Sequence, residues 1–199
     1  MQYASKIPQF RRYLVATRVA LSGEKGDPLW CGVGEIWLEN EKEQIESLQS
    51  REFLAASRDE PNWAASWRRV QLDTTAHPIL SGPKETRDSS MVKLLVLSKR
   101  REGLPLDRFR SYCLDTHAAK VLELPGLRRY IQGHVRDGAY AVGEAMLDCV
   151  EQLWFDSVDA ALAAQSSVQQ EIVRADYRLF TEERYIHTML VQEHWIIGP

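Results

Sequence analysis

The sequence IPQFRRY at residues 7–13 recurs as LPGLRRY at residues 124–130, an offset of 117 positions. Two more pairs of segments match at this offset without a gap: VGEIWL at 33–38 with VEQLWF at 150–155, and HPIL at 77–80 with HWII at 194–197. The matches place rare Trp and His residues and both RRY triplets in one register. A fixed offset of this kind is the signature of a repeated structural unit. The sequence therefore predicts two tandem copies of one unit.

The two copies differ in length. The second has about 33 residues, from Met91 onward, that have no counterpart in the first. Between the copies, residues 81–90 are polar and contain Gly and Pro, which is the composition of a linker. We therefore expect a first copy at 1–80, a linker at 81–90 and a second copy at 91–199.

Apolar periodicity gives the order of elements in the second copy. The run MVKLLVLS at 91–98 is typical of a buried strand. A helix is expected at 106–122, with one face formed by Leu106, Phe109, Cys113, His117 and Val121. The remaining expected elements are strands at 127–135 and 145–155 around a turn at Asp137-Gly138, a helix capped by Asp156-Ser157 and running to about Val173, and a strand at 185–197.

This order, β-α-β-β-α-β, is that of a ferredoxin-like α+β unit. The first copy gives only β-β-α-β and lacks the opening strand and helix. A four-stranded sheet with helices on one face needs cover for its other apolar face, so we expect two sheets to meet as a dimeric-type α+β barrel. The shorter first copy leaves that barrel incomplete. Either the natural start lies upstream of Met1 or a partner chain supplies the cover, and we favour a homodimer.

Composition excludes several classes of partner. The 199 residues carry a net charge of −3 without a stripe of Lys or Arg, which argues against nucleic acid binding. No apolar stretch approaches the roughly 18 residues of a membrane span, and the first ten residues do not resemble a signal peptide. Cys31, Cys113 and Cys149 are widely separated, which favours a reducing compartment. We expect a cytoplasmic protein.

The second copy resembles the EthD family of dimeric α+β barrel proteins. The likeness is carried by KLLVLSKR at 93–100, FRSY at 109–112, THA at 116–118, LPGLRRY at 124–130, LWF at 153–155 and EHW at 193–195. Where the family usually has Trp and Pro, this sequence has Cys113 and Ala119. The resemblance implies a barrel that binds small molecules. Members are linked to ether and aromatic-compound breakdown and to polyketide tailoring, without one shared reaction.

His117 is the strongest catalytic candidate, because a histidine on an apolar helix face can act as a general acid or base near neutral pH. The family also has a histidine at this site. The alternative is a buried histidine hydrogen-bonded to backbone or to a tyrosine. His134 shares a strand face with Tyr130 and Gln132 and is either part of a pocket wall or an ordinary polar strand residue. Tyr112 would donate to a phenolic or carbonyl oxygen.

Weaker candidates have structural alternatives of equal or greater weight. His194 recurs as His77 and Trp154 recurs as Trp37, so each serves either the core or a ligand. Asp115 and Asp148 would orient a histidine or lie at the surface, and Arg128 would form strand-edge salt bridges or anchor an anionic substrate. We predict no metal site, because His187 and His194 point to opposite faces of one strand and no HExxH motif occurs.

These features favour an enzyme of EthD type that acts without a cofactor on an aromatic or polyketide-like compound. The predicted chemistry is acid/base catalysis by His117, His134 and Tyr112, in a cyclase, dehydratase, decarboxylase or oxygenase-like reaction. His194, Trp154, Asp115 and Arg128 would contact the substrate. The alternative is a binding or accessory protein without chemistry, and a third possibility is a pure assembly protein.

Overall fold

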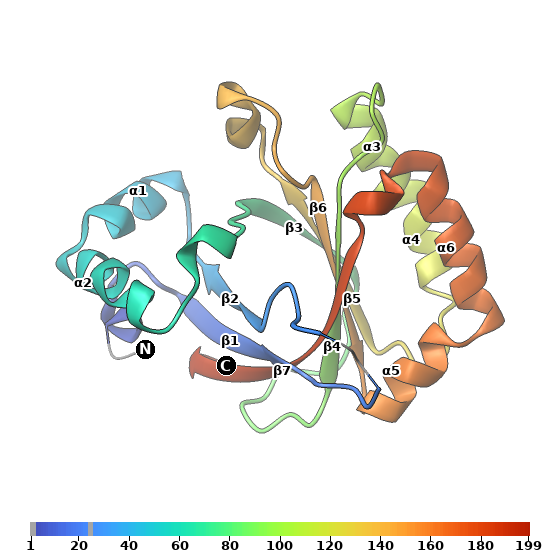
Figure 1. Cartoon of the computed structure of the whole chain (residues 1–199), viewed down its shortest axis with the longest axis horizontal. Helices are drawn as coiled ribbons and strands as arrows, with labels where there is room; N and C mark the ends of the chain where they lie inside the picture. The colour runs from blue at the N-terminus through green and yellow to red at the C-terminus, as the bar shows by residue number, and fades with distance from the viewer. Residues whose placement is uncertain (1–2, 24–25) are drawn as a thin grey trace. The chain divides into compact units, whose positions relative to one another are not determined.

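The computed structural model describes residues 3–23 and 26–199 (Figure 1). The chain forms two compact units. The first unit comprises Met1–Val70, Glu85–Ser89 and Gln192–Pro199, and the second comprises Gln71–Lys84 and Ser90–Val191. The division predicted from the repeat, at 1–80, 81–90 and 91–199, describes copies along the sequence and stays a prediction.

The second unit holds the predicted ferredoxin-like order. Its elements are β3 (Thr74–Leu80), β4 (Val92–Ser98), α3 (Leu106–Tyr112), the π-helical turn η4 (Cys113–His117), α4 (Ala118–Val121), β5 (Arg129–Val135), the 3-10 segment η5 (Asp137–Val142), β6 (Cys149–Phe155), α5 (Val158–Gln165), α6 (Val168–Phe180), the 3-10 turn η6 (Glu183–Tyr185) and β7 (His187–Ile197). The strand order is β7-β4-β6-β5-β3, with β4–β6, β5–β6 and β3–β5 antiparallel. Helices α3 to α6 cover one face of these strands (Figure 1). The predicted α+β fold is confirmed.

The first unit is smaller and is built around the strand order β2-β1-β7. It contains β1 (Arg12–Arg18), β2 (Gly32–Trp37), α1 (Glu41–Gln49), α2 (Arg51–Asp59) and the 3-10 turns η1 (Ala4–Lys6), η2 (Glu60–Asn62) and η3 (Ser66–Arg68). Ile7, Phe10 and Tyr13 form its core cluster. Within the described residues, no strand and only a single 3-10 turn precedes β1.

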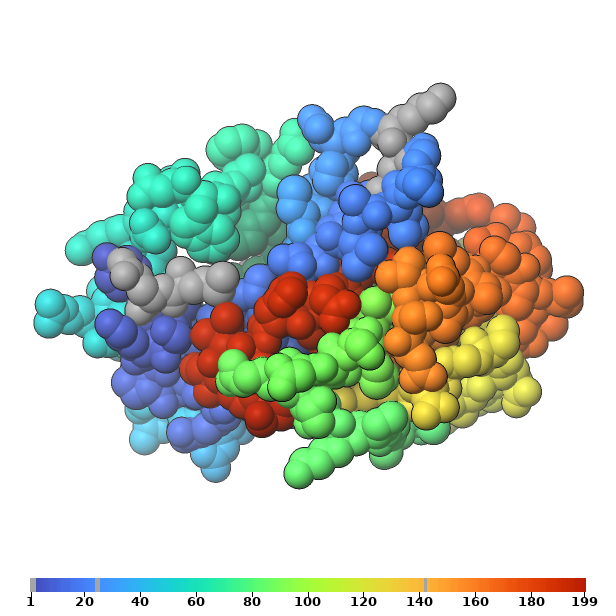
Figure 2. All heavy atoms as spheres, turned by 90° about the horizontal axis from the view of Figure 1, so that it is seen from below, coloured from blue at the N-terminus to red at the C-terminus, as the bar shows by residue number. Residues whose placement is uncertain are grey.

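Residues 85–89 pack along the end of β7 within the first unit (Figure 2). Arg87 donates from Nη1 to the carbonyl of Trp195 at 2.7 Å and from Nη2 to that of Gly198 at 3.2 Å. Gln192 donates to the carbonyl of Ser89 at 3.3 Å. This part of the predicted linker therefore has fixed hydrogen-bond partners.

Two predicted elements are wrong in their bounds. The helix expected from Asp156-Ser157 to Val173 is two helices, because Ser167 begins a new one by accepting a hydrogen bond from the backbone N–H of Gln170 at 3.2 Å. The strand expected from 145 begins only at Cys149, and the expected turn at Asp137-Gly138 is part of η5.

The π-helical turn η4 explains a spacing in the sequence. Phe109, Cys113, His117 and Val121 are four residues apart and all buried. In a straight α-helix, twelve residues would turn Val121 by about 120° away from Phe109. The wider turn of η4 takes up part of this rotation and keeps His117 on the buried face. Such π-turns are frequent at functional sites.

Equivalent contacts recur 117 residues apart, each inside its own unit. Arg12 lies opposite Trp37 on the neighbouring strand, and its guanidinium is 4.8 Å from the centre of that ring. Arg129 lies opposite Trp154 in the same way, with its guanidinium 4.9 Å from the ring centre. Further matched pairs are Arg11–Glu39 at 3.3 Å with Arg128–Asp156 at 3.4 Å, and the helix caps Ser50 with Ser167. A duplicated unit would give this pattern, and the duplication itself stays a prediction.

Candidate functional site

A row of buried polar side chains lies between the helices and the sheet of the second unit. Strand register pairs Gln132 with Glu151 and His134 with Cys149, so these side chains share one face of β5 and β6. Gln132 donates from Nε2 to the carbonyl of Cys113 at 2.9 Å, which places this face beneath η4. Polar groups buried in this way need partners, and most of them form one connected network.

His117 lies at the centre of this network. Its ring is fully buried, with Nδ1 2.7 Å from Oδ2 of Asp176 and Nε2 3.4 Å from Oε1 of Glu151. The rings of Tyr177 and Phe180 pack against it, with centroids at 4.3 and 5.0 Å. Burial alone would lower the pKa of His117, but the two carboxylates outweigh it and raise the pKa to about 9. At neutral pH the imidazole is therefore protonated and can donate but not accept a proton.

Asp176, from α6, connects His117 to the edge of the site. Tyr112 donates its hydroxyl to Oδ1 of Asp176 at 2.8 Å, and the ammonium of Lys120 donates to the same oxygen. Burial alone would raise the pKa of Asp176. Hydrogen bonds from His117, Lys120 and Tyr112 outweigh this effect and lower the pKa to about 2. The structure thus brings the predicted pair Tyr112 and His117 together through a carboxylate that stays ionised.

Glu151, from β6, is the second carboxylate of the network. It accepts hydrogen bonds from the hydroxyls of Tyr177, at 2.7 Å, and Tyr130. Burial raises the pKa of Glu151, and the charge and hydrogen bonds of His117 together with the two tyrosines lower it below its usual value. A buried carboxylate is costly unless it is paired in this manner. Glu151 therefore carries the opposite charge to His117.

His134 is the other predicted histidine, and Gln132 fixes its tautomer. The Gln132 amide nitrogen donates to the Cys113 carbonyl and, at 2.6 Å, to the Tyr130 hydroxyl, so its oxygen faces Nε2 of His134 at 3.0 Å. An oxygen can only accept, so Nε2 of His134 carries the hydrogen and Nδ1 carries the lone pair. That Nδ1 atom is buried and has no hydrogen-bond partner among residues 3–23 and 26–199.

The surroundings keep His134 neutral. Burial is the main cause that lowers its pKa, to about 4; the neighbouring His77 and Arg110 add to the effect, and the charge of Glu151 opposes it. The ring of His77 on β3 lies 4.8 Å from that of His134. One site thus contains a protonated imidazole at His117 and a neutral imidazole at His134, and Tyr130, Gln132 and Glu151 link the two.

The remaining predicted site residues lie elsewhere. His194 is exposed in the first unit, with Nε2 2.9 Å from Oγ1 of Thr17. Trp154 lies on the opposite face of β6 from Glu151, with the Lys93 ammonium 5.0 Å from its ring. Asp115 is exposed on η4, and Arg128 is exposed and forms an ion pair with Asp156. The structure does not bring these four residues to the network around His117.

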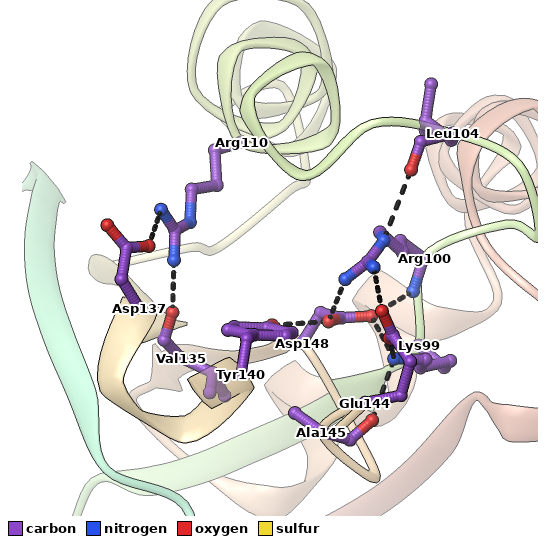
Figure 3. Close-up of polar contacts among 10 residues, drawn as sticks. All are labelled: Lys99, Arg100, Leu104, Arg110, Val135, Asp137, Tyr140, Glu144, Ala145 and Asp148. Atoms are coloured by element: carbon purple, nitrogen blue, oxygen red, sulfur yellow. Dashed lines mark hydrogen bonds and ion pairs between the residues drawn. The ribbon is translucent and has the colours of Figure 1, made fainter. Parts of the chain in front are cut away.

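Asp148 is buried rather than at the surface. It accepts hydrogen bonds from the backbone N–H and Nη1 of Arg100, both at 2.8 Å, and lies 3.0 Å from Nζ of Lys99. The hydroxyl of Tyr140 also donates to it (Figure 3). These contacts tie the segment between β5 and β6 to the end of β4.

Sequence reasoning missed Asp176, Glu151 and the role of Gln132. A weak signal was present for each carboxylate. Glu151 alternates with Cys149 and Leu153 on one strand face, and Asp176 occurs among buried apolar residues of α6. In the described part of the chain, no group of three or more His, Cys, Asp or Glu residues is arranged to hold a metal ion. None of the helices there is long and apolar enough to cross a membrane.

Comparison with known proteins identifies the domain that carries this site. Residues 101–184 match the EthD domain. The matched segment contains all the residues of the network from Tyr112 to Tyr177. No curated protein is significantly similar to the chain.

Two of the solved structures similar to this chain have TM-scores above 0.5 and share its fold. An anthrone oxidase-like protein has a TM-score of 0.62 and 12% identity, covering 98% of this chain and 83% of its own. A protein from Lactobacillus acidophilus, provisionally assigned as a monooxygenase, has a TM-score of 0.53 and 8% identity, covering 96% and 84%. An EthD family protein from Bacillus halodurans has a TM-score of 0.44 and 20% identity, covering 51% of this chain and 97% of its own.

Proposed function

We propose that this protein is an enzyme acting on a small molecule by acid/base chemistry, with His134 as the base. The observation that carries the proposal is the buried lone pair on Nδ1 of His134, whose orientation is fixed by the hydrogen bond from Nε2–H to Gln132. A buried acceptor without a donor is destabilising by about 1–3 kcal/mol. A ligand that brings an acidic O–H or C–H to this nitrogen would regain that energy and place its proton within reach of a base.

The proposed step is a proton transfer that needs no electron donor or acceptor. Nδ1 of His134 takes a proton from the substrate, which becomes an anion, and Gln132 accepts the hydrogen bond from the resulting imidazolium. The same proton then returns to another atom of the substrate anion, so that the step is an isomerisation of enol type. Of the predicted reactions, those of a cyclase, a dehydratase and an oxygenase-like enzyme can begin with such an anion, whereas a decarboxylase forms it by loss of carbon dioxide.

His117 supports this chemistry as a fixed positive charge. Its imidazolium holds Glu151 ionised, Glu151 orients the hydroxyl of Tyr130, and that hydroxyl accepts from Gln132, the partner of His134. The predicted catalytic roles of His117 and Tyr112 become positioning roles in this proposal. A buried network of this kind is rigid, and rigidity of the supporting groups is what an acid/base site requires.

The anthrone oxidase-like protein suggests a first compound for testing the step. Anthrone has acidic methylene hydrogens whose removal gives an enolate, and their exchange into deuterated water is followed by proton NMR without oxygen present. We expect the wild-type protein to accelerate exchange and His134→Phe to reduce the acceleration by about 10²-fold or more. His194→Phe, which alters an exposed histidine of the first unit, is the matched control. Exchange that is equally fast in the His134 variant would overturn the assignment of the base.

A binding protein without turnover is the second candidate function. The closed charge balance of His117 between Asp176 and Glu151 favours it, because this arrangement stabilises one protonation state instead of cycling between two. In that case a ligand would bind beside His134 and be released unchanged, and His134→Phe would weaken binding while no exchange occurs in either protein.

A homodimer remains part of the proposal. In the first unit β2 ends the strand order, whereas the matching strand β6 in the second unit lies between β4 and β5. Ile36 on β2 is 45% exposed. Sedimentation of the full chain and of Ile36→Lys tests the idea, because a dimer formed along this strand would dissociate in the variant and a monomeric wild type would exclude it.

A further inference from the structure

We propose that Arg110 and His134 form a subsite for one acidic hydroxyl of the ligand, a phenol or an enol, and that Ser98, two strands away, meets a further polar atom of the same ligand. The inference rests on the proposed function, whose base is the same His134, and adds the group that this base meets. It names two residues for which neither the sequence nor the family match assigns a role.

Ser98 and His134 stand in one row across the sheet. Ser98 pairs with Cys149 across β4 and β6, and Cys149 pairs with His134 across β6 and β5, so the three side chains point to the same face. Two strand spacings put the outer residues roughly 10 Å apart. Ser98 is 1% exposed and His134 is 2% exposed. Within the described residues, Oγ of Ser98, like Nδ1 of His134, lacks a hydrogen-bond partner.

Arg110 reaches the same end of the sheet from α3 (Figure 3). Its Nη2 donates to the carbonyl of Val135, the residue after His134, at 2.5 Å, and its Nη1 donates to Asp137 at 2.7 Å. The Nε atom is buried and has no partner in the part of the chain that the structure describes. Since Asp137 is 85% exposed, it screens the guanidinium charge only weakly. Arg110 therefore offers one unused N–H donor close to the backbone of His134.

The three unused groups select the ligand by their hydrogen-bond roles. Nδ1 of His134 can only accept, Nε of Arg110 can only donate, and Oγ of Ser98 can do either. A hydroxyl fits the first two, because its hydrogen bonds Nδ1 and its oxygen accepts from Nε–H, while Ser98, two strand spacings from His134, is left for another polar atom of the ligand. A carboxylate has no hydrogen for Nδ1, and an ether has none either. When the proton moves to Nδ1, the oxygen becomes an anion beside the Arg110 guanidinium, which strengthens that contact.

Binding of three matched aromatic probes to the full chain tests this subsite. The probes are 4-nitrophenol, its methyl ether 4-nitroanisole and 4-nitrobenzoate, and the binding of each is measured by calorimetry. We expect nitrophenol to bind at least about tenfold more tightly than either other probe, which is the worth of one charge-assisted hydrogen bond.

Substitutions distinguish a loss of binding at the subsite from a loss of the folded structure. Arg110→Met should weaken the binding of nitrophenol by about tenfold while leaving the binding of nitroanisole unchanged. Arg108→Met, an exposed position on the same helix, is the matched control and should bind all probes as wild type does. Ser98→Ala should give a smaller loss of the same kind.

Three results would overturn the subsite: no binding of any probe, equal binding of nitrophenol and nitroanisole, or tighter binding of nitrobenzoate. The assay needs no turnover, so its outcome is independent of the anthrone experiment. Selective binding of nitrophenol without anthrone exchange would leave the subsite in place and remove the proposed catalytic function. Anthrone exchange without selective binding of nitrophenol would support the proposed catalytic function and remove the subsite.

Discussion

The imidazole of His117 and the carboxylate of Asp176 form a fully buried ion pair, with Nδ1 and Oδ2 2.7 Å apart. The chain segments that carry them are separated by 59 positions. A second carboxylate, Glu151, faces the other ring nitrogen. Such a charge arrangement makes stability depend on pH in a defined direction.

The free energy of unfolding should fall when His117 loses its proton. Its pKa is raised from 6.5 to about 9 in the folded protein, so its contribution is fully present below pH 6.5 and is lost as the pH rises through about 9. The loss should be up to about 3 kcal/mol, given the free energy that corresponds to one pKa unit. Urea unfolding of wild type and His117→Gln between pH 6 and pH 9.5 measures it. Equal slopes for the two proteins over this range would contradict the raised pKa.

Removing the charge of Asp176 should be strongly destabilising. Asp176→Asn leaves the His117 imidazolium facing one carboxylate and takes an acceptor from Tyr112 and Lys120. Breaking a buried pair by removing one partner costs about 3–5 kcal/mol. The matched control is Asp115→Asn, an exposed aspartate on η4, which should change stability by less than about 0.5 kcal/mol. Similar urea midpoints for both variants would show that the pair contributes little.

The three thiols should differ in reactivity. Cys31 is exposed, whereas Cys113 and Cys149 are buried. The pKa of Cys149 is raised well above its usual value by the hydrogen bond with Cys113 and by burial, and a protonated thiol is a poor nucleophile. Titration with a thiol-specific disulfide reagent should therefore modify one cysteine rapidly and the other two only in denaturant. Cys31→Ser should abolish the rapid phase, and its persistence would place a second thiol at the surface.

The side chain of Ser167 should stabilise the start of α6 more than the side chain of the neighbouring Ser166 does. Ser167 accepts a hydrogen bond from Gln170 N–H at the start of α6, the helix that carries Asp176. Ser167→Ala should lower the free energy of unfolding by about 0.5–2 kcal/mol. Ser166→Ala alters the exposed residue just before it and should have a much smaller effect. Thermal unfolding of both variants decides this, and equal shifts would remove the capping role.

Local patterns predicted most of the fold. The run at 91–98 and the helical spacing at 106–122 identify elements because burial of one face leaves a period in the sequence. The break at Ser166-Ser167 was missed, since a serine pair inside a run of helix formers does not stop a periodic pattern. Only the hydrogen bond from Gln170 N–H shows that Ser167 begins a helix.

The candidate site was predicted in part. The face of the helix pointed to His117, and strand alternation placed His134 with Tyr130 and Gln132, which the structure confirms. The partners of His117 were missed because Asp176 and Glu151 come from distant elements, and no spacing rule reports which charges meet across a core. Those two carboxylates decide which histidine is charged, so the acid and base roles follow from tertiary structure.

The chain passes between its two compact units at four points, after Val70, Lys84, Ser89 and Val191. The second unit contains β3, which precedes residues 81–90 in the sequence, and the first unit contains the last residues of β7. A fragment containing residues 91–199 would hold the whole EthD match yet lose the strand that pairs with β5. A fragment that begins or ends at residues 81–90 would therefore lack part of both units. Experiments on either unit need the whole chain.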